Sequence, residues 1–458
     1  MRYRIEKDLL GQRQVPAEAY YGIETLRGKE NFEITKRGIC RQMIKALAIV
    51  KKAAAKANVD ALNIDEKVGK AIMLACDEIL NGRLHGQFVT DLIQGGAGTS
   101  MNMNANEVIA NRANELLGGK KGVYDFVHPN DHVNFGQSTN DVIQTAGKIA
   151  IVKQLKKLQV ELKKLYNAYL NKATEFKDVI KMGRTHLQEA LPLRLGQEFS
   201  AYASALNRDM KRIDVAIEAL LEVNMGATAI GTSLNANEKY RKKVIYYLNK
   251  FSGEQIKPAK DLIDATRNFD TFGQASSTLK LLALNLSKTA SDLRLMASSG
   301  SNGFSEITLP HVQPGSSIMP GKYNPVVPEM VNQVCFYVIG LDVTITKAIE
   351  AGQLELNVFG PIILMSLFEQ ITTLRRATRT FHNLAISGLI ANTTKYKTDN
   401  SIYLITALSP HLGHEEACNV VNEAISSEKT IKQVLLDHHI LSEEIINMVL
   451  DESNMTNP

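Results

Sequence analysis

Apolar residues recur at steps of three and four along the stretch that follows Asp141, with lysines and glutamates between them. The apolar positions are Ile143, Ala146, Ile149, Ala150, Leu155, Leu158, Leu162, Leu165, Tyr166, Tyr169, Ala173 and Phe176. This pattern predicts a single amphipathic helix. At about 1.5 Å per residue, roughly 40 residues make a rod about 60 Å long. Helices of that length are typical of a bundle rather than of a compact globular fold.

The spacing of the prolines predicts four further long helices. No proline occurs between Pro129 and Pro192, between Pro192 and Pro258, or between Pro258 and Pro310. The expected helices are one with Pro192 in its first turn that runs to about Val223, one from Leu262 to Ser299, one from Glu329 to Phe359, and one from Pro361 to about Ser387. Small residues in "GATAIGTSLNA" (226–236) separate the first two of these.

Five long helices between residues 142 and 388 define an expected central domain. Residues 1–141 read as an N-terminal domain of shorter helices with a small β element at "RYRIEKD", and residues 389–458 read as a small domain of short helices. The predicted fold class is therefore all-α, with three domains.

The charge pattern, the apolar windows and the cysteines indicate which partners and which compartment to expect. The 53 basic and 48 acidic residues are spread along the chain, so no basic block predicts a nucleic-acid partner. The start, "MRYRIEKDLL", has no apolar signal core, and no window approaches the roughly 18–20 apolar residues that span a bilayer. The four cysteines (Cys40, Cys76, Cys335 and Cys418) form no CxxC pair and are expected to be separate reduced thiols. We expect a soluble, cytoplasmic protein without membrane contact.

A first polar segment, "GGAGTSMNMNANEVIANRANELLGG" (95–119), carries five asparagines inside a predicted helix. Thr99 or Ser100 is expected to cap this helix, and Gly118-Gly119 to end it. Asparagine is a poor helix former, so the cluster indicates either an exposed, irregular helix or a buried polar network. The glycines beside Thr99 would also let backbone amides approach a ligand closely.

A second polar segment, "QSTNDVI" (137–143), lies where the longest helix is expected to start. Ser138, Thr139, Asn140 and Asp141 are all good capping residues, so helix capping explains them without any function. The alternative is that the free N–H groups and positive dipole end of the helix bind a carboxylate together with the hydroxyls.

A third segment, "KMGRTHLQEALPLRLGQE" (181–198), is predicted to join two helices, with Gly183 ending one and Pro192 opening the next. Thr185 and His186 would then lie in the turn. A histidine in a turn is usually only solvent-exposed, but these residue types also suit anion binding and proton transfer.

The proline-rich stretch "QPGSSIMPGKYNPVVPE" (313–329) interrupts the helical pattern. Gly315 and Gly321 would make it mobile, while Lys322 and Asn324 supply a cation and an amide that can hold a carboxylate. The chain has no GxSxG elbow, and Lys322 lies six residues after Ser316, so an SxxK serine nucleophile is disfavoured. No HExxH motif or Cys/His cluster predicts a zinc site.

These segments together resemble the aspartase/fumarase (class II) superfamily. Its hallmark loop is GSSxMPxKxN, and residues 315–324 match it throughout as "GSSIMPGKYN". The segments "GTSMNMNANEV", "STND" and "GRTHLQEA" are similar to the family's other substrate-binding segments in order and spacing. The resemblance covers essentially the whole chain.

Within the superfamily, the chain looks most like the aspartase branch. The segments "AYYGIETLRGKENFEIT" (19–35) and "EVNMGATAIGT" (222–232) favour that branch, as does Thr139, where fumarases tend to carry serine. Three departures leave efficiency and detailed specificity open: Phe135-Gly136 before Gln137, Ser233 in place of a glycine, and Gly360 where an acidic residue is usual.

The resemblance implies the reversible deamination of L-aspartate to fumarate and ammonia, by anti β-elimination through an aci-carboxylate. It assigns the carbon–nitrogen lyase roles as follows: Thr99, Ser138, Thr139 and Ser317 to the β-carboxylate; Thr185, Lys322 and Asn324 to the α-carboxylate; Asn140 and His186 to the amino group; Ser316 to the general base; and Glu329 to orienting the histidine. A serine is a weak base, so loop amides and a helix terminus would have to favour its alkoxide.

The resemblance also implies a homotetramer. Its central domains would form a twenty-helix core, and each active site would take segments from three subunits, which explains why the polar segments lie far apart in sequence. The resemblance implies no cofactor and no metal for turnover, although a divalent cation activates some relatives. The competing readings are a class II fumarase, which shares the carboxylate site, and a catalytically silent structural homologue.

Overall fold

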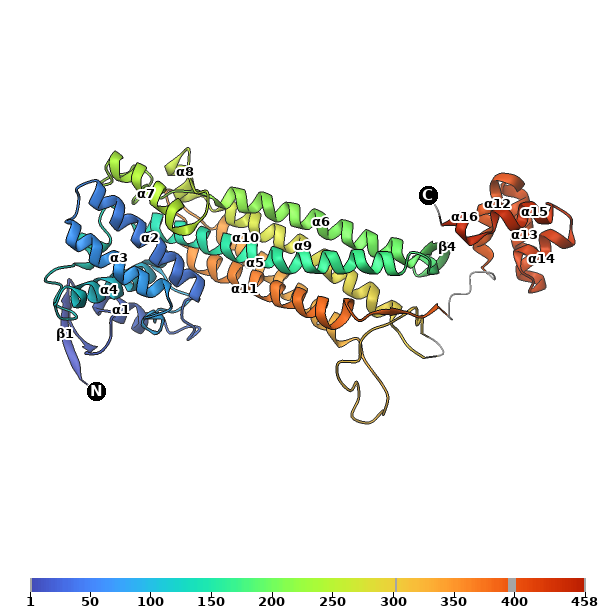
Figure 1. Cartoon of the computed structure of the whole chain (residues 1–458), viewed down its shortest axis with the longest axis horizontal. Helices are drawn as coiled ribbons and strands as arrows, with labels where there is room; N and C mark the ends of the chain where they lie inside the picture. The colour runs from blue at the N-terminus through green and yellow to red at the C-terminus, as the bar shows by residue number, and fades with distance from the viewer. Residues whose placement is uncertain (1, 301–302, 394–400, 457–458) are drawn as a thin grey trace. The chain divides into compact units, whose positions relative to one another are not determined.

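The computed structural model describes residues 2–300, 303–393 and 401–456. The chain divides into two compact units. Unit 1 comprises Met1–Val160, Asp209–Ala283 and Val334–Arg375, and unit 2 comprises Glu161–Arg208, Leu284–Gln333 and Arg376–Pro458. The division falls within each of the five long helices, so every one of them contributes a segment to both units (Figure 1).

Five long helices confirm the main prediction from the sequence. They are α5 (Thr139–Glu175), α6 (Leu195–Leu220), α9 (Asp270–Met296), α10 (Val326–Glu350) and α11 (Gly360–Phe381). The remaining elements of unit 1 are β1 (Tyr3–Asp8), β2 (Gly11–Pro16), α1 (Ile23–Asn31), α2 (Arg41–Asp60), α3 (Glu66–Leu80), η1 (His85–Gln87), η2 (Gly96–Gly98), α4 (Thr99–Leu116), η3 (Pro129–Val133), β5 (Glu222–Val223), α7 (Glu238–Ser252), β6 (Lys257–Pro258) and α8 (Leu262–Arg267).

The remaining elements of unit 2 are two small sheets and short helices: β3 (Ile180–Thr185), β4 (Gln188–Arg194), β7 (Ile307–Thr308), η4 (His382–Ile386), β8 (Ile390–Ala391), η6 (Ile402–Leu404), α12 (Ile405–Leu412), α13 (His414–Ser427), α14 (Ile431–Asp437), α15 (Glu443–Val449) and α16 (Glu452–Met455). The strands pair as β1–β2, β3–β4, β5–β6 and β7–β8, each in a two-stranded sheet. The all-α prediction is therefore confirmed, since helices dominate the described residues and the strands form only these small sheets. The expected division at residues 141 and 388 stays a prediction.

The connection between the first two long helices was predicted wrongly. Helix α5 ends at Glu175 and Gly183 lies inside strand β3, while Pro192 lies inside β4 and α6 starts only at Leu195. The two strands form an antiparallel hairpin with a register shift at Gly183. A Cβ atom at Gly183 would lie 2.7 Å from the carbonyl oxygen of Leu191, so the close approach of the strands requires glycine.

Two other helix boundaries also differ from the expected ones. The stretch from Leu262 forms two helices, because Asn268 between α8 and α9 has an extended backbone. Helix α10 starts at Val326, before Glu329, and ends at Glu350 rather than near Phe359. Residues 351–359 instead form a turn held by Asn357, whose side-chain amide donates to the carbonyl oxygens of Ala348 and Ile349 at 3.0 and 3.1 Å. Propensity alone does not reveal this local competition with the helix.

The asparagine-rich segment forms a buried helix. Asn102, Asn104, Asn106, Asn111 and Asn114 of α4 are all at most 1% exposed, which rules out the exposed, irregular helix. Their amides hold neighbouring loops. Asn104 donates to the carbonyl oxygen of Gln87 at 2.9 Å, Asn111 to that of Tyr20 at 2.8 Å, and Asn114 to that of Val127 at 2.6 Å. The cluster is thus a buried polar network that supplies hydrogen bonds to loops.

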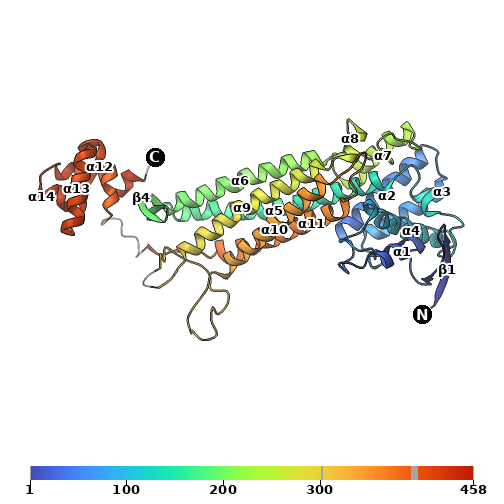
Figure 2. The ribbon, with the colours of Figure 1, turned by 180° about the vertical axis from the view of Figure 1, so that it is seen from behind.

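Within unit 1, segments of the long helices lie side by side and share buried hydrogen bonds (Figures 1 and 2). Ser276 of α9 donates to Oδ1 of Asp342 of α10 at 2.7 Å, and Gln370 of α11 donates to the Ser276 hydroxyl at 3.2 Å. Helices α5 and α11 approach closely at Gly147, where a Cβ atom would lie 2.5 Å from Cδ2 of Leu364. These polar contacts fix the register of helices whose apolar faces would otherwise slide.

Unit 2 has its own packing. Asn332 of α10 donates to the hydroxyls of Ser287 and Ser291 of α9, at 2.9 and 3.1 Å. The rings of Phe176 and Phe199 pack edge to face, with centroids 5.6 Å apart. The short C-terminal helices bury a separate apolar cluster: Ile405, Leu408, Ala417, Val420, Ala424, Ile431, Val434, Leu435 and Ile446.

Helix α10 is the one helix among the described residues that is long and apolar enough to cross a membrane, judged by length and composition alone. From the sequence we expect no such window, so α10 departs from that prediction. Core helices of bundles pass the same test, and α10 carries the buried polar residues Asn332 and Asp342, both hydrogen-bonded to α9. The apolar composition of α10 therefore fits a helix of the bundle.

Candidate active site

The N-terminus of α5 carries three predicted substrate-binding residues, Ser138, Thr139 and Asn140. The Ser138 hydroxyl accepts the backbone N–H of Asn140 at 3.2 Å, and Oδ1 of Asp141 accepts the N–H of Ser138 at 3.0 Å. Capping is therefore present, as the simpler interpretation predicted. The three side chains nevertheless remain half-buried rather than covered, at the positive end of a 37-residue helix.

Asp141 ties this helix end to the loop after α6. Its Oδ2 atom accepts the backbone N–H groups of Gly226 and Thr228 at 3.1 and 3.0 Å. The side chain of Asn140 donates to the carbonyl oxygen of Ala229 at 2.7 Å. Burial raises the pKa of Asp141 to about 6, while these backbone donors act in the opposite direction. The loop therefore fixes the orientation of the helix end.

A buried lysine lies behind the same helix end. Nζ of Lys51 of α2 donates to Oδ1 of Asn134 at 2.8 Å and to Oε1 of Gln137 at 3.0 Å. The side-chain amide of Asn102 joins the same Asn134 oxygen, at 3.2 Å, to the hydroxyl of Thr139, at 3.3 Å. Lys51 is fully buried, and burial lowers its pKa to about 7, opposed by the charge of Asp141. A chain of hydrogen bonds thus connects a buried amine with a predicted carboxylate-binding hydroxyl.

Thr99 is the first residue of α4, and it does not cap that helix as predicted. Gly98, in the left-handed region at φ +95°, occupies the cap position, and the hydroxyl of Thr99 donates to the carbonyl oxygen of Gly96 at 2.7 Å. The helix ends at Leu116, and Gly118 follows in the left-handed region, close to the predicted end. Thr99 is exposed at the free helix N-terminus.

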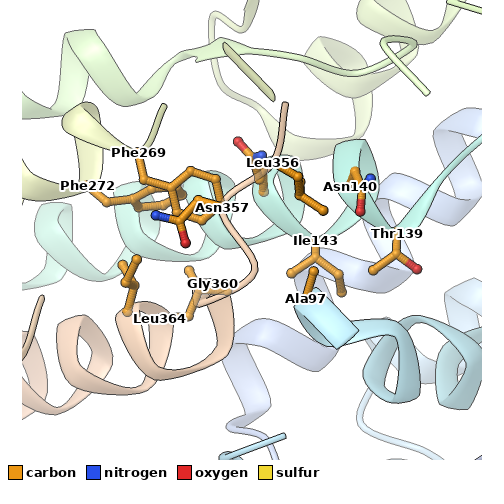
Figure 3. Close-up of a pocket in the computed structure, with 12 residues that line it drawn as sticks. Ala97, Thr139, Asn140, Ile143, Phe269, Phe272, Leu356, Asn357, Gly360 and Leu364 are labelled. Atoms are coloured by element: carbon orange, nitrogen blue, oxygen red, sulfur yellow. The ribbon is translucent and has the colours of Figure 1, made fainter. Parts of the chain in front are cut away.

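A small cavity lies beside the N-terminus of α5. It has a volume of about 10 Å³. Figure 3 shows Thr139, Asn140 and Ile143 on the first turns of α5, Ala97 next to Ile143, and Gly360 and Leu364 on α11. Two residues of the predicted substrate-binding set therefore line a cavity whose remaining walls are mainly apolar.

Thr185 and His186 lie at the tip of the β3–β4 hairpin and are exposed. Thr185 pairs with Gln188, which leaves a two-residue turn made of His186 and Leu187. Both turn residues are in the left-handed region, at φ +55° and +63°. Glycine and asparagine usually fill such a turn, and each other residue costs about 1 kcal/mol or more. This strain at an exposed histidine supports a functional reading of the turn.

Buried charges anchor strand β3 of this hairpin. Nζ of Lys181 lies 2.7 Å from Oε2 of Glu306 and 3.1 Å from Oε2 of Glu198, and the Arg184 guanidinium pairs with the Glu306 carboxylate. The Arg184 guanidinium also lies 4.3 Å from the centre of the Phe304 ring. The Glu306 and Lys181 side chains are only 4% and 5% exposed. Strand β3 is therefore held near its start and also next to the turn, so that the tip of the hairpin has a defined position.

The loop with Ser316 closes on itself. The N–H of Gly315 donates to the carbonyl oxygen of Lys322 at 2.8 Å, and the side chain of Asn324 donates to the carbonyl oxygen of Gly315 at 2.7 Å. A Cβ atom at Gly315 would lie 2.5 Å from the carbonyl oxygen of Lys322, so only glycine fits where the two ends of the loop meet. Ser316 and Ser317 directly follow Gly315, at the start of the loop that these contacts close.

Ser316, the predicted general base, accepts hydrogen bonds from two backbone N–H groups of its own loop. Its Oγ atom accepts the backbone N–H groups of Ile318 and Met319 at 3.2 and 3.1 Å. Hydrogen bonds donated to an oxygen favour its charged form. The structure thus provides the two loop amides that an alkoxide at Ser316 would require.

Lys322 and Asn324 line a cavity of about 370 Å³ next to this loop. The His311 and Tyr323 rings stack at its edge, with centroids 3.6 Å apart. Lys322 is exposed, so its ammonium is accessible to an anion. Glu329, in the first turns of α10, has its Oε1 atom 3.9 Å from Nη2 of Arg294.

The predicted site residues therefore form three groups in one chain. Thr99, Ser138, Thr139 and Asn140 belong to unit 1, at the N-termini of α4 and α5. In unit 2, Thr185 and His186 form the hairpin tip, and Ser316, Ser317, Lys322, Asn324 and Glu329 belong to the loop and the start of α10. Among the described residues, no group of three or more His, Cys, Asp or Glu side chains is placed to hold a metal ion.

Sequence reasoning missed Lys51 as part of this site, and gave Asp141 no role beyond capping. A signal for Lys51 exists: it falls on the apolar face of α2, four residues after Leu47 and seven before Asn58. A lysine on the buried face of a helix is an exception that usually marks a paired or functional group.

Comparisons with known proteins agree with these motifs. A family model described as Lyase matches residues 11–340, and one described as Fumarase C C-terminus matches residues 404–457. The aspartate ammonia-lyase of Bacillus subtilis (strain 168) is 51% identical over 458 residues, which cover 100% of this chain and 96% of that protein. The chain belongs to the aspartate ammonia-lyase family.

Other relatives extend the likeness. The aspartate ammonia-lyases of Helicobacter pylori (strain ATCC 700392 / 26695) and Escherichia coli (strain K12) are 48% and 45% identical, over 99% of this chain and 98% and 96% of theirs. The crystal structure of recombinant class II fumarase from Schistosoma mansoni matches with a TM-score of 0.97 at 34% identity, and that of fumarate lyase:delta crystallin from Brucella melitensis bound to cobalt matches with a TM-score of 0.96 at 44% identity. Both matches cover 100% of each chain.

Proposed function

We propose that the chain is a carbon–nitrogen lyase that converts L-aspartate reversibly to fumarate and ammonia. The observation that carries this proposal is the full-length identity of 45–51% to aspartate ammonia-lyases, together with the complete GSSxMPxKxN loop. A class II fumarase is the second candidate, because one solved fumarase has a nearly identical fold. The lower identity to that fumarase, 34%, favours aspartate.

The reaction needs a base for a weakly acidic proton on the β-carbon. Ser316 would take that proton, and its contacts with the N–H groups of Ile318 and Met319 support the role because they stabilise an alkoxide. The electron pair of the broken C–H bond would then move into the adjacent carboxylate and form the aci-carboxylate. Anti elimination follows when the C–N bond pair leaves with nitrogen.

The aci-carboxylate carries extra negative charge, so preorganised donors lower the barrier. Thr99, Ser138, Thr139 and Ser317 would supply these donors. For the three in unit 1, the support is their position at the N-termini of α4 and α5, where the dipole favours an anion. The chain of hydrogen bonds from Lys51 to Thr139 would hold one of these hydroxyls in place.

Thr185, Lys322 and Asn324 would hold the α-carboxylate, and Asn140 and His186 would face the amino group. The accessible ammonium of Lys322 and the exposed, strained turn at His186 support these assignments. We further propose that Glu329 orients His186.

A homotetramer with sites shared by three subunits is part of the proposal. Helix α10 exposes large apolar side chains, with Phe336 63%, Tyr337 47% and Val343 59% exposed. Such a face on a long helix is typical of an interface. The twenty-helix core would bury it. A monomer with full activity in light scattering would contradict the shared sites.

We propose that turnover needs no bound cofactor and that the enzyme acts in the cytoplasm. The four cysteines, all within the described residues, are free thiols, which fits a reducing compartment. An assay with EDTA and then with added Mg²⁺ would reveal any activation by a divalent cation.

A paired assay tests the function directly. The appearance of fumarate is followed by its ultraviolet absorbance after addition of L-aspartate or, separately, of L-malate. We expect fumarate from aspartate and little from malate. Release from malate alone would assign the chain to the fumarases, and release from neither would support the silent homologue.

A further inference from the structure

One side chain at the small cavity of unit 1 has an unused hydrogen-bonding atom. Gln144 lies one turn after Asn140 on α5, and residues four apart share a helix face. It lines the cavity and is only 4% exposed. Its Nε2 atom donates to the carbonyl oxygen of Thr266 at 2.8 Å, whereas its buried Oε1 atom has no hydrogen-bond partner within the described part of the chain.

An unpaired buried acceptor is costly, commonly by about 1–3 kcal/mol, so a small donor is expected to occupy the space next to it. The cavity volume, about 10 Å³, matches a single molecule the size of water. Its walls include Ile143, Phe269 and Leu356, which disfavour an ion. The occupant must therefore be small, neutral and able to donate a hydrogen bond.

The proposed reaction produces such a molecule at this place. When the C–N bond breaks, both of its electrons leave with the nitrogen, so an ammonium substituent departs as neutral NH3. Asn140, the residue assigned to the amino group, lines the same cavity (Figure 3). We propose that this cavity is an ammonia subsite, in which Oε1 of Gln144 accepts an N–H of NH3. This inference rests on the proposed function.

The amination direction tests the subsite. Initial rates are measured with saturating fumarate while ammonia is varied, and with saturating ammonia while fumarate is varied. Gln144→Leu keeps the shape of the side chain and removes the acceptor. We expect its KM for ammonia to rise about five- to tenfold, with the KM for fumarate unchanged.

A second variant approaches the cavity from the opposite wall and leaves Gln144 and its bond to Thr266 intact. Gly360 lines the cavity, and a Cβ atom there would lie 3.3 Å from Cε2 of Phe269. Gly360→Ala would therefore fill part of the space. We expect the same selective rise in the KM for ammonia.

The chain also offers a matched control. Gln154 lies on the same helix and is 3% exposed, and its Oε1 atom likewise has no partner among the residues that the structure describes. It does not line the cavity. Gln154→Leu should leave the KM for ammonia unchanged. Melting temperatures establish that all three variants fold.

Each outcome is decisive. An unchanged KM for ammonia in both folded cavity variants would overturn the subsite and assign the space to water. An equal rise in both KM values, or the same rise in the Gln154 variant, would also overturn it, because the effect would then be general. A parent chain that neither deaminates aspartate nor aminates fumarate would overturn the function and the subsite together.

Discussion

The Nζ atom of Lys51 donates a hydrogen bond to Oδ1 of Asn134, 2.8 Å away, at a position where the lysine side chain is fully buried. The same asparagine oxygen accepts the Asn102 amide, which reaches Thr139 at the start of α5. Lys51, whose pKa is strongly lowered by burial, is thus connected by hydrogen bonds to a residue of the proposed site. Its titration should be visible in the pH dependence of stability.

The first prediction concerns the pH dependence of stability. Burial lowers the pKa of Lys51 to about 7, below its usual 10.5. Between these pH values the unfolded chain binds a proton that the folded chain has released, so this lysine makes stability rise with pH from about 7 to 10. Lys51→Met should remove that contribution, about 1.4 kcal/mol per pH unit, from denaturant unfolding curves.

The neighbouring Lys52 provides the control, because it pairs with Asp77 at 2.5 Å and its side chain is 18% exposed. Lys52→Met keeps Lys51, so the rise of stability with pH that Lys51 produces should remain in this variant. If Lys51→Met also keeps it, the lysine is hydrated in the folded protein.

The second prediction concerns Glu107 of α4, which caps the N-terminus of α1. Its carboxylate accepts the backbone N–H groups of Gly22, Glu24 and Thr25 at 2.8, 2.9 and 3.1 Å. Glu107→Gln replaces one accepting oxygen by a donor that faces these groups. We expect a loss of about 2–3 kcal/mol in the free energy of unfolding. Glu66→Gln, in an exposed pair with Lys70, should leave the free energy of unfolding almost unchanged.

Glu107 should also change the pH dependence of stability, in the direction opposite to that of Lys51. Burial raises its pKa to about 7, from 4.5. Between these values the folded chain holds a proton that the unfolded chain has lost, so the contribution of this group falls as pH rises through that window. Unfolding curves at pH 5 and pH 7 should show a smaller gap between parent and Glu107→Gln at pH 7. A gap that widens with pH would contradict the raised pKa.

The third prediction distinguishes the role of Ser316, the proposed base, from that of Ser317, the proposed carboxylate-binding residue beside it. Ser316→Ala should lower kcat for aspartate about 10²–10⁴-fold and leave the Kd of fumarate, measured by calorimetry, within threefold. Ser317→Ala should mainly raise the KM. Full turnover by the Ser316 variant would exclude this serine as the base, whereas a lost affinity for fumarate would assign it to holding the loop.

The fourth prediction concerns the hairpin anchor. Glu306→Gln leaves Lys181 and Arg184 without their buried counter-charge, and breaking a buried pair costs about 3–5 kcal/mol. We expect a lower melting temperature and a raised KM for aspartate, because Thr185 is at the tip of this hairpin. Glu198→Gln is the control, since its side chain is 24% exposed and Lys181 keeps Glu306; it should cost less than about 1 kcal/mol.

Periodicity and proline spacing predicted the five long helices, because each helix buries one face and the resulting pattern is local. The same reasoning failed for residues 176–194. There the chain turns into a hairpin whose strands pair with each other and whose strand β3 is anchored by Glu306, more than a hundred residues away. No local pattern contains that partner.

The candidate site divides in the same way. The sequence alone determined the motif residues, from Thr99 to Glu329, because hydroxyl, amide and amine groups in the order of a known family are legible without coordinates. Only the tertiary structure decided that Lys51 is buried, that Asp141 holds the loop at Gly226, and that Gln144 lines a cavity. It also decided that the buried Oε1 atom of Gln144 has no partner among the described residues. Burial and hydrogen-bond satisfaction depend on side chains brought together from distant segments, and these set the pKa values and cavities that residue type leaves open.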